Sequence, residues 1–550
     1  MQSIDVVLAM LLAVLASGYL VRMLPFSLPL PLVQIGLGAV VAGVFGEGVR
    51  LDPEIFFLVF VPPLLFLDGW RIPKDDLRRD RAVVLEMALG LVVFTVVGAG
   101  FLVHWMIPSM PIAVAFALAA IVSPTDPVAV SSIAQRVRIP RRLMHVLEGE
   151  SLLNDASGLV CFRFAVAAAM TGAFSLAQAS LTFLWVALVG LAVGAGFTIG
   201  VNRAQNWLSR RFGQESGTPI LVSLLTPFGA YLIAEHLSAS GILAAVAAGV
   251  AMSRVEMSGR ALAATRVQRA AVWDTIQFTL NGIMFVLLGE QLPSIWRAAI
   301  EWMRHEAHRS DWWLLGWALA LNAGLVALRF AWVWVTWTLA LRVPELRGQQ
   351  LPYASGGRPQ WRLVAATSLA GVRGAITLAG VLSLPLLLPD GRAFPARDLA
   401  IFLATSVILV SLLAASLGLP RVLHGLQLPA EGKDEREQRF ALREAAEAAV
   451  QAIDRAANAL PKEPADADLY NRAAVRVVSL YEPRRRDEKD AGGVEAQALR
   501  RADAAERELR LVGLRAEREH IYALARAHRI SDATARKLVR EIDLLEARQR

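Results

Sequence analysis

Disulfide bonds, metal-binding spacings and motifs for bond-breaking catalysis are all missing from this sequence. Its 550 residues include a single cysteine, Cys161, so no intrachain disulfide can form. The sequence contains no Cys/His metal spacing, no phosphate-binding glycine-lysine loop and no nucleophile elbow. These absences argue against a disulfide-stabilised secreted domain and against an enzyme, and no cofactor is expected.

Charged residues are also sparse, at 19% of the chain, where soluble domains average about 25%. Apolar residues make up 55% and the mean hydropathy is +0.47. The apolar excess lies in the first 430 positions, in segments of about 20 residues, the length that crosses a bilayer as a helix. The sequence therefore predicts an all-α polytopic membrane protein with thirteen membrane-spanning segments, at about 4–21, 28–46, 53–69, 82–106, 110–133, 144–171, 179–202, 218–235, 239–253, 272–292, 312–341, 361–388 and 398–418.

Basic residues in the short loops predict the orientation. With the N-terminus outside, the loops that face inward hold 21 Lys and Arg residues, and those that face outward hold six. Cytoplasmic loops carry the Lys/Arg excess, so we expect the N-terminus outside and the C-terminus in the cytoplasm of a bacterial inner membrane. This placement explains the net charge of +8 without a nucleic-acid partner. The start of the chain has no basic signal-peptide region, so the first segment is expected to be retained.

Residues 431–550 differ in composition from the rest of the chain. They are rich in Ala, Arg, Glu and Leu, and charges of both signs alternate between apolar positions. This pattern predicts solvated helices in a cytoplasmic tail, with residues 484–494 as a linker between two helical portions. The tail could serve either assembly and stability or regulation, and its sequence pattern is compatible with both roles.

The fifth apolar segment contains the sequence Ser123-Pro124-Thr125-Asp126-Pro127. Each proline removes a backbone donor and disfavours helix for the residue before it, so we expect the helix to unwind here. Non-helical backbone at membrane depth occurs where protein or a watery cavity covers it, and transporters use such breaks to build ion sites. A simple kink, with Asp126 capping the second half of the helix, is the alternative.

The sixth segment contains a second polar cluster, formed by Glu150, Ser151, Asn154 and Asp155. Residues four apart share a helix face, so Glu150 lies above Asn154 and Ser151 above Asp155. Oxygen ligands of these types suit hard monovalent cations, and burial disfavours the charged form of a carboxyl group. A buried Asp155 could therefore hold either a proton or a cation, which is the requirement for an exchanger.

Three arginines also fall inside apolar segments. Arg329 and Arg373 cannot lose their charge, so each needs an anion nearby, and Glu150 is the expected partner in a structural charge network. Arg163 is expected to reach the membrane surface or to find a carboxylate, without a role in transport. The histidines near the segment ends are expected to be surface or capping residues rather than pH sensors, namely His145, His236 and His424.

Four motifs occur in a fixed order: Pro62-Pro63, Thr125-Asp126-Pro127, Glu150-Ser151-x-x-Asn154-Asp155 and Gly371-x-Arg373-Gly374. Together they resemble the bacterial NhaP and eukaryotic NHE type sodium/proton antiporters, and the resemblance covers about residues 1–425. It implies an NhaA-like inverted-repeat fold with unwound, crossing helices, assembled as a homodimer. Helices at 82–171 and 312–418 would form a moving core, and those at 4–69 and 179–292 a dimer scaffold.

The same resemblance implies roles for single residues. Asp155, Asp126, Ser151 and the carbonyl of Thr125 would bind sodium, and Asn154 is expected to belong to the same ion- and proton-binding site. Electrogenic members of the family have Asp-Asp where this chain has Asn154-Asp155, so the resemblance implies electroneutral exchange. One exchangeable carboxylate, balanced by one proton or one cation, leads to the same expectation.

The function expected from the sequence is therefore secondary active exchange of sodium, or another monovalent cation, for protons by alternating access. Potassium in place of sodium is the first alternative, because the sequence does not fix ligand geometry. A cation channel could use the same carboxylates, and a membrane receptor could carry the polar tail. The expected partners are sodium, protons, membrane lipid and a second copy of the chain.

Overall fold

The computed structural model describes residues 2–23, 28–45, 53–71, 84–126, 130, 141–171, 176–213, 217–257, 263–307, 310–342, 354–355, 358–424, 432–459, 464–481, 493–527, 529 and 532–549. The chain divides into two compact units, Met1–Leu426 and Gln427–Arg550. Helices dominate both units, and the described strands are the two-residue pair β1 (Ala354–Ser355) and β2 (Arg358–Pro359).

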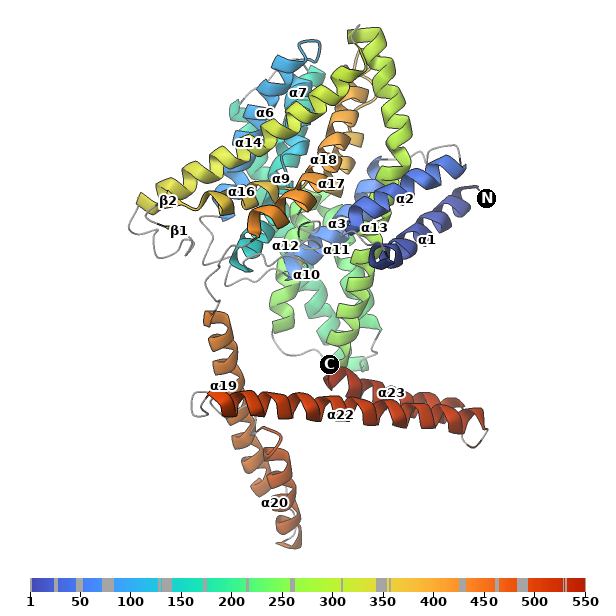
Figure 1. Cartoon of the computed structure of the whole chain (residues 1–550), viewed down its shortest axis with the longest axis vertical. Coiled ribbons are helices and arrows are strands. Elements are labelled where there is room, and N and C mark those ends of the chain that lie inside the picture. The colour runs from blue at the N-terminus through green and yellow to red at the C-terminus, as the bar shows by residue number, and fades with distance from the viewer. Residues whose placement is uncertain are drawn as a thin grey trace. The chain divides into compact units, whose positions relative to one another are not determined.

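Each of the thirteen expected segments contains a helix of the first unit (Figure 1). Seven helices in the described residues are long and apolar enough to cross a membrane, and three shorter apolar helices accompany them. Several helices exceed the expected segments, and α10 and α13 reach 37 and 40 residues. The helices are α1 (Gln2–Met23), α2 (Leu30–Phe45), α3 (Pro53–Arg71), the π-helix η1 (Glu86–Leu91), α6 (Val92–Met106), α7 (Ile112–Val122), α9 (Arg141–Thr171), α10 (Leu176–Phe212), α11 (Thr218–His236), α12 (Gly241–Met257), α13 (Ala263–Trp302) with the π-helix η2 (Met303–Ala307), α14 (Trp312–Arg342), α16 (Trp361–Leu369), α17 (Ala375–Leu382) and α18 (Arg397–Leu423).

Two of the expected membrane segments are interrupted. Helix α7 ends at Val122, and the four residues 123–126 are not helical, which confirms the break predicted from the prolines; Pro127 lies outside the described residues. The twelfth segment is divided into α16 and α17 by a non-helical stretch at 371–374. Two glycines bound that stretch, and glycine lowers helix propensity by about 1 kcal/mol relative to alanine.

The helices of the first unit pack in two groups (Figure 1). In one group α3, α10 and α11 pack on α12, and α1 and α13 pack on α2. In the other group α6 and α9 pack on α7, and α14, α16 and α17 pack on α18. Helices α3, α13, α17 and α18 make contacts between the groups, so part of one broken segment, α17, lies at the boundary between them.

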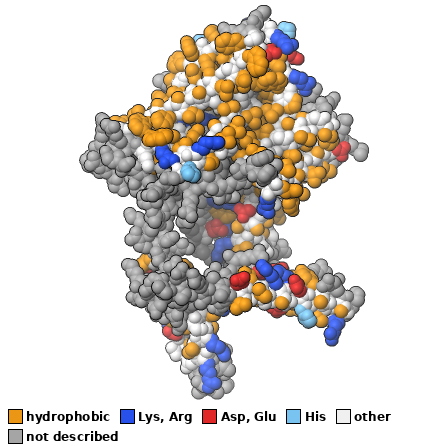
Figure 2. Space-filling model, in the orientation of Figure 1, with side chains coloured by type: hydrophobic (Ala, Val, Ile, Leu, Met, Phe, Trp, Pro, Cys, Tyr) orange, Lys and Arg blue, Asp and Glu red, His pale blue; other side chains and the backbone are white. Residues whose placement is uncertain are grey.

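The surface of the first unit is apolar. Figure 2 shows hydrophobic side chains over most of its visible face, with few charged side chains among them. Large aromatic residues are exposed near helix ends, among them Trp105 at 78% and Trp312 at 80%. Such exposure would be costly in water, but aromatic side chains at this position suit the two interfaces of a bilayer.

The described residues of the second unit form four helices, α19 (Gly432–Ala459), α20 (Pro464–Val478), α22 (Gly493–Arg526) and α23 (Asp532–Gln549). Helix α22 packs on α23, and Arg518 bonds to Asp543 and Glu546, each at 2.6 Å. Most of the predicted linker at 484–494 lies outside the described residues. Its last two residues belong to α22, because their high-propensity neighbours extend the helix back to Gly493.

Candidate functional site

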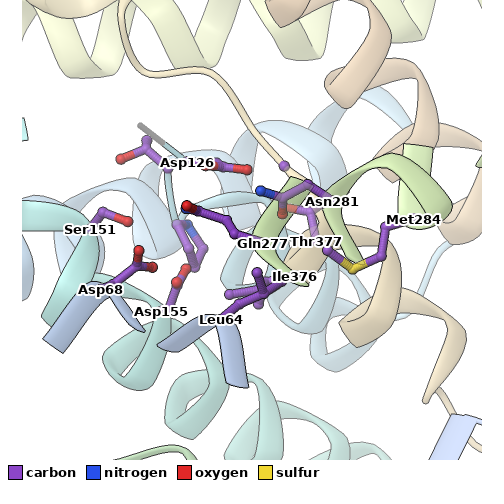
Figure 3. Close-up of a pocket in the computed structure, with 13 residues that line it drawn as sticks. Leu64, Asp68, Asp126, Ser151, Asp155, Gln277, Asn281, Met284, Ile376 and Thr377 are labelled. Carbon is purple, nitrogen blue, oxygen red and sulfur yellow. The ribbon is translucent and has the colours of Figure 1, made fainter. Parts of the chain in front are cut away.

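A polar cavity lies between the two helix groups (Figure 3). Three carboxylates line it: Asp68 from α3, Asp126 from the break after α7, and Asp155 from α9. Figure 3 shows these side chains on one side of the cavity together with Ser151. Carboxylates that share one cavity repel each other unless a proton or a cation balances them, so this cluster is suited to bind either.

Helix α9 supplies two of these side chains from one face. Ser151 and Asp155 both line the cavity, as the four-residue spacing predicts. Both are buried, with exposed fractions of 5% and 6%. One turn beyond Asp155, a side chain at Gly158 would collide with the ring of Pro124. The glycine therefore allows the broken segment to lie directly against α9.

The two breaks are joined by their backbones. The amide of Asp126 donates a hydrogen bond of 2.7 Å to the carbonyl of Val372, which connects the interruption after α7 to that between α16 and α17. Gly374 lies beside the Asp126 carboxylate, and a Cβ on Gly374 would overlap that carboxylate. The position of Asp126 in the cavity thus depends on both non-helical stretches.

Behind the cavity, a chain of hydrogen bonds runs from α9 to α14. The amide of Asn154 donates to the hydroxyl of Thr125 at 3.0 Å, and this hydroxyl donates to Glu150 at 3.0 Å. Arg329 then binds both oxygens of Glu150, at 2.5 and 2.7 Å. The Thr125 hydroxyl is used in this chain of hydrogen bonds, so the role in cation binding expected of Thr125 is left to its carbonyl oxygen.

The Glu150–Arg329 pair is almost fully enclosed. The side chains are 1% and 2% exposed, and the Nε of Arg329 also donates to the Thr367 carbonyl at 3.1 Å. The expected partnership between Glu150 and an arginine inside the membrane is therefore present for Arg329. Both oxygens of Glu150 are used by this pair, and Glu150 does not line the cavity.

Arg373 differs from its expected arrangement. Instead of pairing with Glu150, its guanidinium donates to the carbonyls of Val122, at 2.9 Å, and Gly371. These carbonyls belong to the ends of interrupted helices, which carry partial negative charge and lack helical partners. Arg373 therefore connects the two breaks and binds no carboxylate within ion-pair distance in the described part of the chain.

Asn154 also differs from its expectation as a member of the ion site. Its side chain is 1% exposed, is not part of the cavity lining, and donates to Thr125. Asn154 lies on the face of α9 that carries Glu150. Positions 154 and 155 are about 100° apart around a helix, so the Asn154 amide points away from Asp155.

Four polar residues that line the cavity were not predicted from the sequence: Asp68, Gln277, Asn281 and Thr377. Asp68 could have been predicted from the sequence. A carboxylate within an apolar segment is costly in a membrane and is therefore presumed to be functional. The amides of Gln277 and Asn281 carry no such penalty. Only the packing of α13 against the broken segments brings them to the cavity.

Arg163, His236 and His424 are not among the residues that line the cavity. Arg163 pairs with Glu235 of α11 at 3.2 Å, so it has found a carboxylate, one of the two expected outcomes. The Nδ1 of His236 lies 2.8 Å from the Leu232 carbonyl on the preceding turn, as expected for a capping residue. The side chain of His145 lies outside the described residues.

Comparisons with known proteins agree with this architecture. The family described as sodium/hydrogen exchanger, transmembrane, matches residues 8–425. The Escherichia coli K12 protein YjcE, described as an uncharacterized Na+/H+ exchanger, is 41% identical over 548 residues, which cover 98% of both chains. A sodium, potassium, lithium and rubidium/H+ antiporter of Bacillus pumilus is 45% identical over 416 residues, 74% of this chain and 60% of that protein.

Among solved structures, the sodium/proton antiporter MjNhaP1 of Methanocaldococcus jannaschii shares the fold. The alignment has a TM-score of 0.56 and 16% sequence identity, and it covers 78% of this chain and 99% of MjNhaP1. The family match spans the whole first unit apart from its first seven residues and Leu426, including the cavity and both breaks. This chain is therefore a member of the sodium/hydrogen exchanger family.

Proposed function

We propose that this Na+/H+ antiporter exchanges one monovalent cation for one proton at the cavity that contains Asp155, by alternating access. The observation that supports this most directly is the convergence of three carboxylates and Ser151 in one cavity between two helix groups. A cation and a proton that compete for the same carboxylate cannot be bound together, and this competition couples their movements.

In this proposal Asp155, Asp126, Ser151 and the Thr125 carbonyl bind the cation, and Asp68 is added to them. Asn154 carries no charge and its amide donates to Thr125, so it adds no second exchangeable proton on α9. This supports electroneutral exchange. Glu150 and Arg329 hold Thr125 and α14 in place, and Arg373 fixes the two breaks.

The two helix groups support the proposed mechanism. Helices α6–α9 and α14–α18 would move as the core, corresponding to 82–171 and 312–418, against a scaffold of α1–α3 and α10–α13. The interruption of both α7 and the α16–α17 segment supports an inverted repeat, because the breaks occupy matching places in the two halves of the core. Thirteen spans, an outer N-terminus, a cytoplasmic tail, an inner-membrane location and a homodimer complete the proposal.

The cation that we propose is sodium, which the family description and the names of the relatives share. Potassium is a second candidate, since the Bacillus subtilis relative at 42% identity is also described as a sodium, potassium, lithium and rubidium/H+ antiporter. The proposed site supplies oxygen ligands from carboxylates, Ser151 and Thr125, and all of these suit either cation.

Transport in proteoliposomes tests this function. Vesicles that contain a pH-sensitive dye are made acidic inside, and sodium, lithium or potassium is added outside. We expect cation-dependent alkalinisation that persists when the membrane potential is clamped at zero and is lost in Asp155→Asn. Asp390→Asn is the matched control, because Asp390 pairs with Arg392 in an exposed loop.

Two results would contradict the proposal. Cation-driven proton movement that survives in folded Asp155→Asn would remove Asp155 from the mechanism. Sustained single-channel currents from the unaltered protein would indicate a channel instead of a carrier.

A further inference from the structure

The cavity has a second end that the proposed ion site does not use. Opposite the carboxylates, Asn281 and Met284 of α13 and Ile376 and Thr377 of α17 line it. Figure 3 shows Asn281 and Thr377 on the side away from Asp68 and Ser151. This end contains no charged residue among the cavity-lining side chains, and its polar groups are one amide and one hydroxyl. We call it the neutral end.

These two polar groups have no hydrogen-bond partner within the described part of the chain. Neither the Asn281 amide nor the Thr377 hydroxyl takes part in a hydrogen bond, although Thr377 is only 2% exposed. Two buried amides elsewhere in the first unit, by contrast, donate to backbone carbonyls: Asn202 to Thr198 at 2.9 Å and Asn322 to Ala318 at 2.8 Å. A buried polar group without a partner is costly, so the Thr377 hydroxyl, together with the half-buried and unbonded Asn281 amide at the same end of the cavity, indicates a ligand.

Gln277, whose amide lies between the two ends of the cavity, is not available to a ligand in the same way. Its Oε1 accepts a hydrogen bond of 2.8 Å from Arg71, and Arg71 also pairs with Asp274. The Gln277 oxygen is therefore directed to a neighbouring cation of the protein itself. Asn281, one turn further along α13, is the amide whose oxygen is available to the cavity.

The two ends of the cavity offer a cation different oxygens. Carboxylates at one end are strong-field ligands, and the Asn281 amide and the Thr377 hydroxyl at the other end are weak-field dipoles. The number and field strength of such dipoles contribute to the choice between potassium and sodium in channels. A larger cation needs more oxygens at longer distances, and a small cation can be satisfied by the carboxylate end alone.

We propose that Asn281, together with Thr377, determines the cation preference of this antiporter by completing the coordination shell of the larger alkali cations. The inference rests on the proposed function, because it assigns specificity to the same cavity. Asp155 and its neighbours bind every transported cation, and the neutral end lowers the cost of binding potassium and rubidium relative to sodium and lithium.

The test compares half-saturating concentrations of sodium, lithium, potassium and rubidium in proteoliposomes. In Asn281→Ala we expect the values for potassium and rubidium to rise about tenfold, equivalent to about 1.4 kcal/mol of binding free energy. Those for sodium and lithium should change much less. Thr377→Val, which keeps the side-chain shape, should shift the ratio in the same direction and serves as the second variant if Asn281→Ala does not fold.

Two matched controls separate selectivity from general damage. Asn322→Ala removes a buried amide of the same type from α14, outside the cavity, and should leave the potassium-to-sodium ratio unchanged. Met284→Leu alters the shape of the neutral end without removing an oxygen, and it should also leave the ratio unchanged.

An unchanged potassium-to-sodium ratio in both folded variants, Asn281→Ala and Thr377→Val, would overturn the inference. The proposed function would still stand if the unaltered protein exchanges cations for protons. A shift in Met284→Leu as large as in Asn281→Ala would assign the effect to cavity shape and would also overturn it. If the unaltered protein transports sodium or lithium but neither potassium nor rubidium, the neutral end selects no larger cation and the inference is wrong. If it exchanges no cation, the inference and the proposed function fail together.

Discussion

Arg329 binds both carboxylate oxygens of Glu150, at 2.5 and 2.7 Å, across 179 positions of the sequence. The two side chains are 2% and 1% exposed. Taking either charge out of water costs several kcal/mol, and the attraction between them offsets this cost only while both are present.

Removing one member of this pair should therefore destabilise the fold. We expect Glu150→Leu and Arg329→Met each to lower the free energy of unfolding by about 3–5 kcal/mol, because each leaves an uncompensated buried charge. The double variant should lose less than either single one. Thermal unfolding of the purified proteins in detergent ranks the stabilities of the two single variants and the double variant. Additive losses in the double variant would contradict this account.

The pair between Arg163 and Glu235 provides the comparison. These side chains are 56% and 32% exposed, and exposed ion pairs contribute about 0–1 kcal/mol. Arg163→Ala should thus change the unfolding temperature far less than Arg329→Met.

Asp68→Asn should weaken cation binding without unfolding the protein. The substitution keeps the size of the side chain and removes one of three carboxylates from the cavity. We expect the half-saturating sodium concentration to rise by about tenfold, or about 1.4 kcal/mol, in the dye assay. Asp311→Asn, in an exposed pair with Arg304, is the control. Unchanged saturation in Asp68→Asn would show that α3 contributes no ligand.

Gly374→Ala should displace Asp126 and impair exchange. A Cβ at this position would overlap the Asp126 carboxylate, whereas a Cβ at Gly316 of α14 would meet nothing within 4 Å. Gly316→Ala should therefore be neutral or stabilising by up to about 1 kcal/mol, since alanine favours helix. Initial exchange rates of the two variants, at equal amounts in the vesicles, decide the matter. Equal rates would mean that Gly374 is dispensable.

Deleting the second unit, Gln427–Arg550, should leave exchange in place. The cavity and both breaks lie within the first unit, so the truncated protein retains every proposed ligand. The measurement is the dye assay on truncated and full-length protein. A folded truncated protein that transports nothing would favour the receptor alternative, in which the tail carries the activity.

Much of the helical architecture could be predicted from the sequence because apolar runs and prolines act locally. The break after Val122 follows from Pro124, whose effect reaches only its neighbours. The shared cavity lining of Ser151 and Asp155 follows from helical spacing. An arginine partner for Glu150 could be expected because an isolated charge in the membrane is costly.

Other features depend on tertiary packing and could not be read in this way. The carbonyls of Val122 and Gly371 compete with Glu150 for Arg373, and backbone acceptors leave no trace in a sequence. Asn281 reaches the cavity only because α13 packs beside α17. The extra length of α10 and α13 continues through polar residues with good helix propensity, and a hydropathy criterion ends a helix too early there.

The distance along the chain between Glu150 and Arg329 also has a consequence for biosynthesis. At about 5–20 residues per second, a ribosome needs roughly 10–35 s to add the 179 residues that separate them. The hydrogen bond from Asp126 to Val372 forms later still. During that interval Glu150 has no counter-ion from α14, so its carboxyl group must either take up a proton or stay in a polar environment until Arg329 is synthesised.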